Sequence, residues 1–175
     1  MNNPCEHIKK SLRNIALIPE KDLEIFTESL QYKEYNKNTN ILTEGENEQY
    51  IYFIHEGIVK SCTFIDKKEI IFNFTFKGDF VSSYVSFITG EPSEISLRTI
   101  TDCKILRLQK NKLEELYKTH STEHLSRKIC EALYVSKVRR VHDLLKLSAT
   151  ERYIQLLEKE KYFKLIPLKD IARYL

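Results

Sequence analysis

The sequence contains no run of apolar residues long enough to span a membrane as a helix, so it predicts no transmembrane helix. It begins Met1-Asn2-Asn3-Pro4, without the basic region and following apolar stretch of a secretory signal. Of its 175 residues, 42% are hydrophobic and 30% are charged, values typical of a globular chain. These features predict a cytoplasmic protein with no membrane partner.

Cysteine occurs at only four positions, and no two of them form a CxxC pair. Cys5, Cys62, Cys103 and Cys130 are too far apart in the sequence to show the spacing of a zinc or redox site. An iron–sulfur sensor needs several cysteines clustered near the N-terminus, where only Cys5 lies. The pattern predicts four free thiols in a reducing compartment.

Catalytic motifs are missing as well. The sequence has no GxSxG element and no phosphate-binding loop. A small β-barrel metalloenzyme needs closely spaced histidines that point inward, but only His55 of the five histidines lies in the strand-rich region. His120 and His124 lie at the start of a predicted helix, where we expect them to face solvent. We therefore predict no enzyme, no catalytic residue, no metal site and no resident cofactor.

Charge is distributed unevenly along the chain. Residues 1–126 carry 16 basic and 19 acidic side chains, whereas residues 127–175 carry 12 basic and 6 acidic ones. The basic C-terminal third is therefore the part that suits a phosphate-rich partner such as DNA. A solvated basic helix face is the alternative that charge alone leaves open.

Short runs rich in Ile, Tyr, Phe, Val and Thr fill the middle of the chain, as expected for half-buried strands. Glu56-Gly57 joins two of them with no room for a long loop, which predicts a hairpin. Many short antiparallel strands predict a barrel or jelly roll, because these folds protect strand edges by closure or by packing two sheets. The predicted strands are Gln31–Tyr35, Ile41–Thr43, Tyr50–His55, Ile58–Phe64, Glu69–Phe76, Ser96–Ile100 and Lys104–Leu108.

Helical periodicity occupies both ends of the chain. Residues 6–17, 19–30, 110–119 and 150–159 predict short helices, and residues 121–147 predict a long one. Since a helix of that length outruns a small barrel, we expect one of its apolar stripes to meet a second copy of the chain. A core helix within a single chain is the alternative. The predicted homodimer seam is Leu125, Ile129, Ala132, Val135, Val138, Val141 and Leu145.

The last residues of the chain predict a short amphipathic helix that starts at Pro167 and has Leu168, Ile171, Ala172 and Leu175 on its apolar face. A two-turn helix at a bare C-terminus buries little surface and is a poor end for a domain. We therefore expect residues to be missing after Leu175.

This order of elements resembles the cyclic-AMP receptor/fumarate-nitrate regulator (CRP/FNR) family of bacterial transcription factors, over nearly the whole chain. Tyr52–Lys60 is similar to a hairpin of the family, Gly78-Asp79-Phe80-Val81 to the entry of its phosphate-binding cassette, and Pro167–Leu175 to the first helix of its winged helix-turn-helix. The resemblance implies an α+β fold: a double-stranded β-helix jelly roll with flanking helices, a long dimerisation helix and a truncated winged helix-turn-helix. The implied divisions are residues 1–120 for the effector domain with its N-terminal helices, 121–147 for the dimerisation helix and 148–175 for the start of the DNA-binding domain.

The family's cassette binds a cyclic phosphate through backbone N–H groups at a helix start and an arginine, while a carboxylate binds the ribose. Counted from Gly78, the carboxylate position is Ser83 and the arginine position is Ser93, so both charged partners are absent. Losing a buried bidentate phosphate contact costs roughly 2–5 kcal/mol. We therefore predict no tight binding of cyclic AMP. The candidate ligand-binding residues by this resemblance are Gly78, Asp79, Phe80, Val81, Ser82, Ser83, Tyr84, Ser93 and Glu94.

The sequence names no effector. Serine and aromatic side chains in the cassette predict a mixed lining for a small neutral or aromatic ligand, and a filled, vestigial pocket is the alternative. On the long helix, Lys137 and Val138 are the positions expected near a bound base. The full-length protein is expected to bind DNA, with Lys169 and Arg173 touching phosphates. Without its reading helix, this chain is expected to bind DNA weakly or not at all. A stand-alone regulatory module acting through protein partners is the alternative function.

Overall fold

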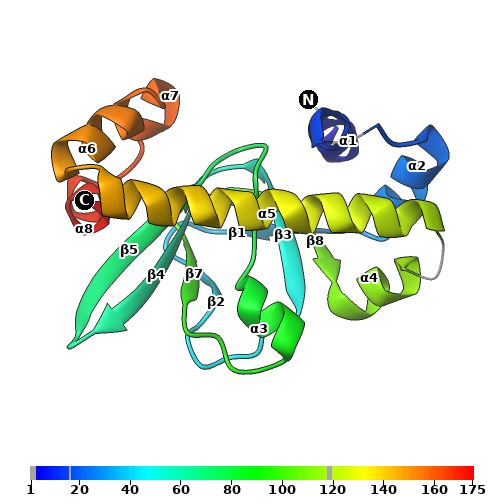
Figure 1. Cartoon of the computed structure of the whole chain (residues 1–175), viewed down its shortest axis with the longest axis horizontal. Coiled ribbons are helices and arrows are strands. Elements are labelled where there is room, and N and C mark those ends of the chain that lie inside the picture. The colour runs from blue at the N-terminus through cyan, green and yellow to red at the C-terminus, as the bar shows by residue number, and fades with distance from the viewer. Residues whose placement is uncertain (1–2, 16, 118–119) are drawn as a thin grey trace.

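The computed structural model describes residues 3–15, 17–117 and 120–175 of the chain. Two antiparallel sheets form its centre, and a single long helix passes beside both of them, with shorter helices at each of its ends (Figure 1). The described helices are α1 (Pro4–Ile15), α2 (Glu20–Glu28), α3 (Tyr84–Thr89), α4 (Lys110–Leu116), α5 (His120–Lys146), α6 (Ala149–Leu157), α7 (Glu160–Phe163) and α8 (Leu168–Tyr174).

Each sheet has four strands. One has the order β1-β8-β3-β6 and the other β2-β7-β4-β5, and all neighbouring strands are antiparallel. The seven predicted strands are confirmed, each to within one residue at either end, whereas the two-residue strand β6 was not predicted. The strands are β1 (Gln31–Tyr35), β2 (Asn40–Leu42), β3 (Tyr50–Glu56), β4 (Val59–Ile65), β5 (Lys68–Thr75), β6 (Phe80–Val81), β7 (Ser96–Thr99) and β8 (Cys103–Gln109).

The predicted hairpin at Gly57 is wrong, because β3 and β4 belong to different sheets. Gly57, with a φ of +99°, is instead the corner at which the chain crosses from one sheet to the other. The link between β7 and β8 makes the same crossing beside it, and the Ile100 N–H donates to the Ile58 carbonyl at 2.8 Å. The strand pattern predicted the turn but not the partner, because short turns serve hairpins and corners alike.

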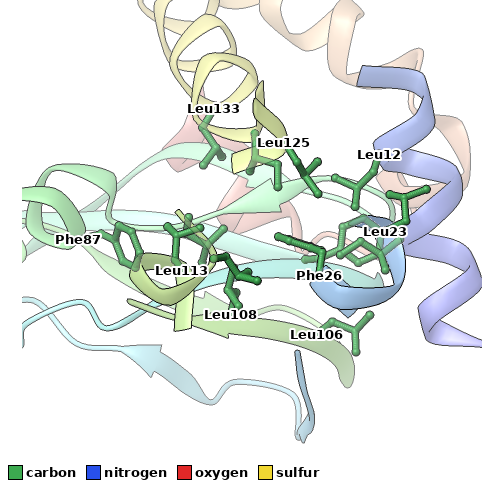
Figure 2. Packing of buried hydrophobic residues seen from close by; sticks show 14 residues of the cluster. Leu12, Leu23, Phe26, Phe87, Leu106, Leu108, Leu113, Leu125 and Leu133 are labelled. Atoms are coloured by element: carbon green, nitrogen blue, oxygen red, sulfur yellow. The ribbon is translucent and has the colours of Figure 1, made fainter. Parts of the chain in front are cut away.

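The largest hydrophobic cluster lies between the β3–β8 sheet and the helices at one end of the molecule (Figure 2). Helices α1, α2 and α4 and the first half of α5 each contribute buried side chains to it. The packing fixes the start of α5 against the sheets. Its members include Leu12, Leu23, Phe26, Phe87, Leu106, Leu108, Leu113, Leu125 and Leu133.

The C-terminal helices pack on the β4–β5 sheet and share a second hydrophobic cluster with it. Ile166 and Ile171 are buried there, and the ring of Tyr174 lies 4.9 Å from that of Phe74. The expectation that α8 buries little surface is therefore wrong, because it docks on β5. Length alone underestimated its burial, since a short helix gains its stability from the surface that it contacts.

The predicted dimer seam is divided in the structure. Leu125 and Ile129 are buried in the chain's own core, and Ala132 and Val138 are half-buried. These positions follow one helical period, but only the first half of α5 lies over the N-terminal helices. The outer part of the seam, Val135, Val141 and Leu145, remains exposed on the chain, as do neighbouring Tyr134 and Leu144.

Candidate functional site

A cavity of about 360 Å³ lies between the second half of α5, the β4–β5 sheet and the cassette segment, residues 78–96. Apolar side chains supply much of its lining, including Phe72, Val81, Val85, Ile95, Leu133 and Leu144. Its volume falls in the range of small-molecule sites. The structure thus brings the cassette and the long helix together around one cavity.

Of the predicted cassette residues, Phe80, Val81, Ser82, Ser83 and Glu94 line this cavity. Gly78 and Asp79 line a neighbouring cavity of about 400 Å³, together with side chains of α1 and α5. Tyr84 packs against the large hydrophobic cluster instead. Burial raises the pKa of the Asp79 carboxyl, only partly offset by Lys159 and by the Phe76 backbone.

The two serines at the predicted charged positions bond to each other. The hydroxyl oxygens of Ser83 and Ser93 are 2.7 Å apart, and both side chains are buried. Ser93 is also bonded to the backbone of Ile95, whose N–H donates to it at 3.2 Å. By the family resemblance, Ser83 and Ser93 are the two positions expected to carry the carboxylate and the arginine. Ser93 thus bonds to Ser83, which lines the cavity, and is not itself part of the lining.

A buried carboxylate that no sequence motif predicted lies at the start of α3. Glu48, 1% exposed, accepts a hydrogen bond from the Ser83 backbone N–H at 3.3 Å. It also accepts from the Tyr50 N–H at 2.9 Å and the Tyr52 hydroxyl at 3.1 Å. Burial raises the pKa of the Glu48 carboxyl, and these hydrogen bonds oppose the rise. An internal carboxyl thus already accepts the N–H of the residue that immediately precedes α3.

The opposite wall, on α5, carries two cationic side chains. Arg140 donates from Nε to the Phe72 carbonyl at 2.6 Å and from Nη2 to the Tyr174 carbonyl at 3.1 Å. Its guanidinium lies 3.7 Å from the centre of the Tyr174 ring. Lys137 lines the cavity too, whereas Val138, the other residue expected near a bound base, is not part of the lining. Desolvation lowers the pKa of both cationic groups.

The two predicted DNA contacts differ in their surroundings. Lys169 is exposed on α8. Arg173 is ion-paired with Glu69 of β5 and lies 3.8 Å from Asp170. Behind this surface, Lys60 of β4 contacts Glu69 at 2.8 Å and Asp170 at 3.3 Å. Arg173 therefore holds α8 to the sheet in this structure.

Histidines do not assemble into a metal centre in the described part of the chain. His55 lies 3.0 Å from His7 of α1, Nδ1 to Nδ1, and burial lowers the pKa of both rings. Within the described ranges, no group of three or more His, Cys, Asp or Glu side chains is placed to hold a metal ion. Nor does any helix in those ranges combine the length and apolarity needed to cross a membrane.

Comparisons with family models, curated proteins and solved structures all point to the same family. The profile of the cyclic nucleotide-binding domain matches residues 32–120. The CRP-like protein Clp of Xanthomonas oryzae pv. oryzae is 22% identical over 138 residues, covering 78% of this chain and 60% of its own length. The chain thus spans less than two thirds of the curated relatives that it matches.

Many solved structures share the fold, and two of them illustrate it. FixK2 from Bradyrhizobium japonicum has a TM-score of 0.68 at 21% identity, covering 83% of this chain and 77% of its own. The c-di-GMP-responsive global regulator CLP of Xanthomonas campestris has a TM-score of 0.63 at 23% identity, covering 80% and 71%. The chain belongs to the cyclic nucleotide-binding domain family and is a distant relative of the CRP/FNR regulators.

Proposed function

We propose that this chain is the effector-sensing and dimerisation part of a cytoplasmic, non-enzymatic CRP/FNR-type transcriptional regulator. In this proposal residues 1–120 are a jelly-roll effector domain, residues 121–147 the dimerisation helix, and residues 148–175 the start of a winged helix-turn-helix. DNA and a small-molecule effector are the proposed partners. The observation that carries the proposal is the cavity enclosed jointly by the cassette and α5. A ligand held there contacts the element that would connect the two copies of a dimer.

The proposed effector is not cyclic AMP. Ser83 and Ser93 bond to each other at 2.7 Å, and Glu48 already occupies the Ser83 backbone N–H. A cyclic phosphate at that wall would find no arginine to pair with and no free Ser83 N–H, so the contacts that normally hold it are missing. The mechanism we propose is that a different ligand binds one arrangement of the dimer better than another and so shifts the equilibrium between them.

A second candidate, a regulatory module that acts through protein partners, is favoured by the docking of α8. Arg173, a proposed DNA contact, is ion-paired with Glu69, and Ile171 is buried against the sheet. If the chain is part of a regulator, either α8 detaches from the β4–β5 sheet to reach DNA, or the sheet moves together with α8. Gel-shift titration of the full-length protein separates the two candidates, since selective DNA binding supports the regulator and its absence supports the module.

Substitution of Leu145 by glutamate tests the dimerisation helix. Leu145 is 79% exposed on α5, and the proposed dimer covers it. A charge in a desolvated apolar interface weakens association by roughly 10- to 100-fold. We expect wild type to sediment as a dimer at micromolar concentration and Leu145→Glu to shift toward monomer.

The control for this substitution is Ile65→Glu at the tip of the β4–β5 hairpin, where an exposed apolar residue also gains a charge. This variant is expected to dimerise as wild type does. A monomeric wild type, or equal dissociation of both variants, contradicts the proposed role of α5.

A further inference from the structure

The cation on the α5 wall of the cavity has unused hydrogen-bonding capacity. Arg140 is 8% exposed, and its Nε and Nη2 groups are bonded to the Phe72 and Tyr174 carbonyls. Its Nη1 group is buried and has no hydrogen-bond partner among the described residues. Buried guanidinium groups are normally fully paired, and a carboxylate is the partner that suits them best. This residue forms part of the cavity wall.

The remaining surfaces of the cavity restrict the charge of a ligand. Glu91 and Glu94 line the cassette side and are exposed, so a second negative charge there is repelled. Between the two walls the lining is mostly apolar, from side chains such as Val81, Val85 and Ile95. A ligand that matches this arrangement has one acidic end and an apolar body.

The donors of Ser83 and Ser93 on the cassette side are not available to bind the acidic end of such a ligand. The backbone N–H of Ser83 is bonded to Glu48, and the hydroxyls of Ser83 and Ser93 are bonded to each other. Arg140, supported by Lys137 one helical turn earlier, is therefore where the cavity can hold a negative charge. A single carboxylate also loses less hydration on burial than a doubly charged phosphate.

We propose that this cavity binds a small amphipathic monocarboxylic acid, with the carboxylate at Arg140 and the apolar body against the cassette. This inference rests on the proposed function, since it names the ligand class of the same effector cavity. Because Arg140 also bonds to the Tyr174 carbonyl, the bound acid contacts the residue that links α5 to α8.

The test compares an acid with its uncharged counterpart on the 175-residue chain. Phenylbutyrate and phenylbutanol share the same apolar body and differ at the polar end. Isothermal titration calorimetry is expected to give saturable binding of phenylbutyrate in the low-millimolar range or tighter. Phenylbutanol is expected to bind about 10-fold more weakly or not at all, because it lacks the charge-assisted bond. Equal binding of the two compounds, or binding of neither, overturns the proposal.

Two pairs of variants locate the site. Arg140→Gln is expected to weaken phenylbutyrate binding by roughly 10- to 100-fold, whereas Arg139→Gln, at the exposed neighbouring position, leaves it unchanged. Because Arg140 also supports the fold, the second pair avoids it. Val85→Glu places a carboxylate in the cavity wall, and Ile88→Glu places one on the same helix outside it. Binding that is lost in Val85→Glu and kept in Ile88→Glu supports the proposal, and equal binding by both contradicts it.

The same samples separate this inference from the proposed function. A dimer that binds neither cyclic AMP nor phenylbutyrate overturns the ligand class alone. A chain that is monomeric, or that binds cyclic AMP at micromolar concentration, contradicts the proposed function, whatever phenylbutyrate does.

Discussion

Replacement of Gly57 by alanine is expected to lower the free energy of unfolding by about 2–5 kcal/mol, the combined effect of a strained backbone and an overpacked corner. Gly57 has a φ of +99°, which an L-residue rarely adopts. A Cβ atom at this position lies 2.5 Å from both the Asp102 carbonyl oxygen and the Cys103 Sγ atom. Neither neighbour can move freely, because Asp102 belongs to the second crossing between the sheets and Cys103 begins β8.

The matched control is Gly45→Ala. Gly45 has a similar φ of +92°, but a Cβ atom there meets nothing within 4 Å. This variant carries the backbone strain without the overlap, so its destabilisation is expected to stay at about 1–2 kcal/mol. Urea denaturation followed by circular dichroism measures both variants. Equal destabilisation would show that the corner has room for a methyl group and would contradict the description of this crossing.

Lys60→Met is expected to destabilise the chain by about 3–5 kcal/mol, the usual effect of removing one partner from a buried ion pair. The Lys60 Nζ lies 2.8 Å from Glu69 and 3.3 Å from Asp170, and the three side chains are 7%, 7% and 5% exposed. Methionine fills similar space but leaves two buried carboxylates, for which Arg173 is the remaining cation among the described ion pairs. Since Asp170 belongs to α8, the loss also weakens the docking of the C-terminal helices.

The control is Lys104→Met, which breaks the exposed ion pair with Glu56. That pair has an equally short distance of 2.7 Å, but its side chains are 45% and 48% exposed. Solvent screens such pairs, so the free energy of unfolding is expected to change very little. A Lys60 variant as stable as the Lys104 variant would contradict the assignment of a buried network.

The effect of Lys60→Met should also depend on pH. Burial alone would raise the pKa of the Glu69 carboxyl, but the hydrogen bond and charge of Lys60, together with smaller effects of Cys62 and Arg173, hold that pKa below its ordinary value. A carboxyl with a lowered pKa stabilises the fold above its unfolded pKa and loses this contribution as the pH falls through its folded pKa. The difference in stability between wild type and Lys60→Met should therefore narrow in acid, as urea denaturation at several pH values can measure.

Much of the fold could be predicted from the sequence because its signals are local. β-branched and aromatic runs identified the strands, and the period of the long helix identified α5. The helical period of α5 could not identify which surface covers each of its apolar stripes. Leu125 and Leu145 share the predicted seam, yet one is buried in the chain's own core and the other is exposed. That difference depends on where the N-terminal helices pack.

The candidate site was predicted mainly on the cassette wall, and of the two residues predicted on the long helix only Lys137 lines the cavity. The cassette residues follow a motif, so their position near a cavity could be inferred from Gly78 onward. Glu48 could not, because its contact with Ser83 joins residues that are 35 positions apart and follows no short pattern. The role of Arg140 could not be predicted either, because in the sequence it is one of several basic residues on a helix. Its burial arises only when α8 docks and Tyr174 covers the guanidinium.

The central claim is that this family member encloses a cavity from which the usual phosphate-binding arrangement is absent. The most direct test is calorimetric titration of the chain with cyclic AMP. Replacement of a bidentate arginine contact by a serine pair corresponds to a loss of roughly 30- to 3,000-fold in affinity. We expect no saturable heat at micromolar concentrations, and a micromolar dissociation constant would contradict the account.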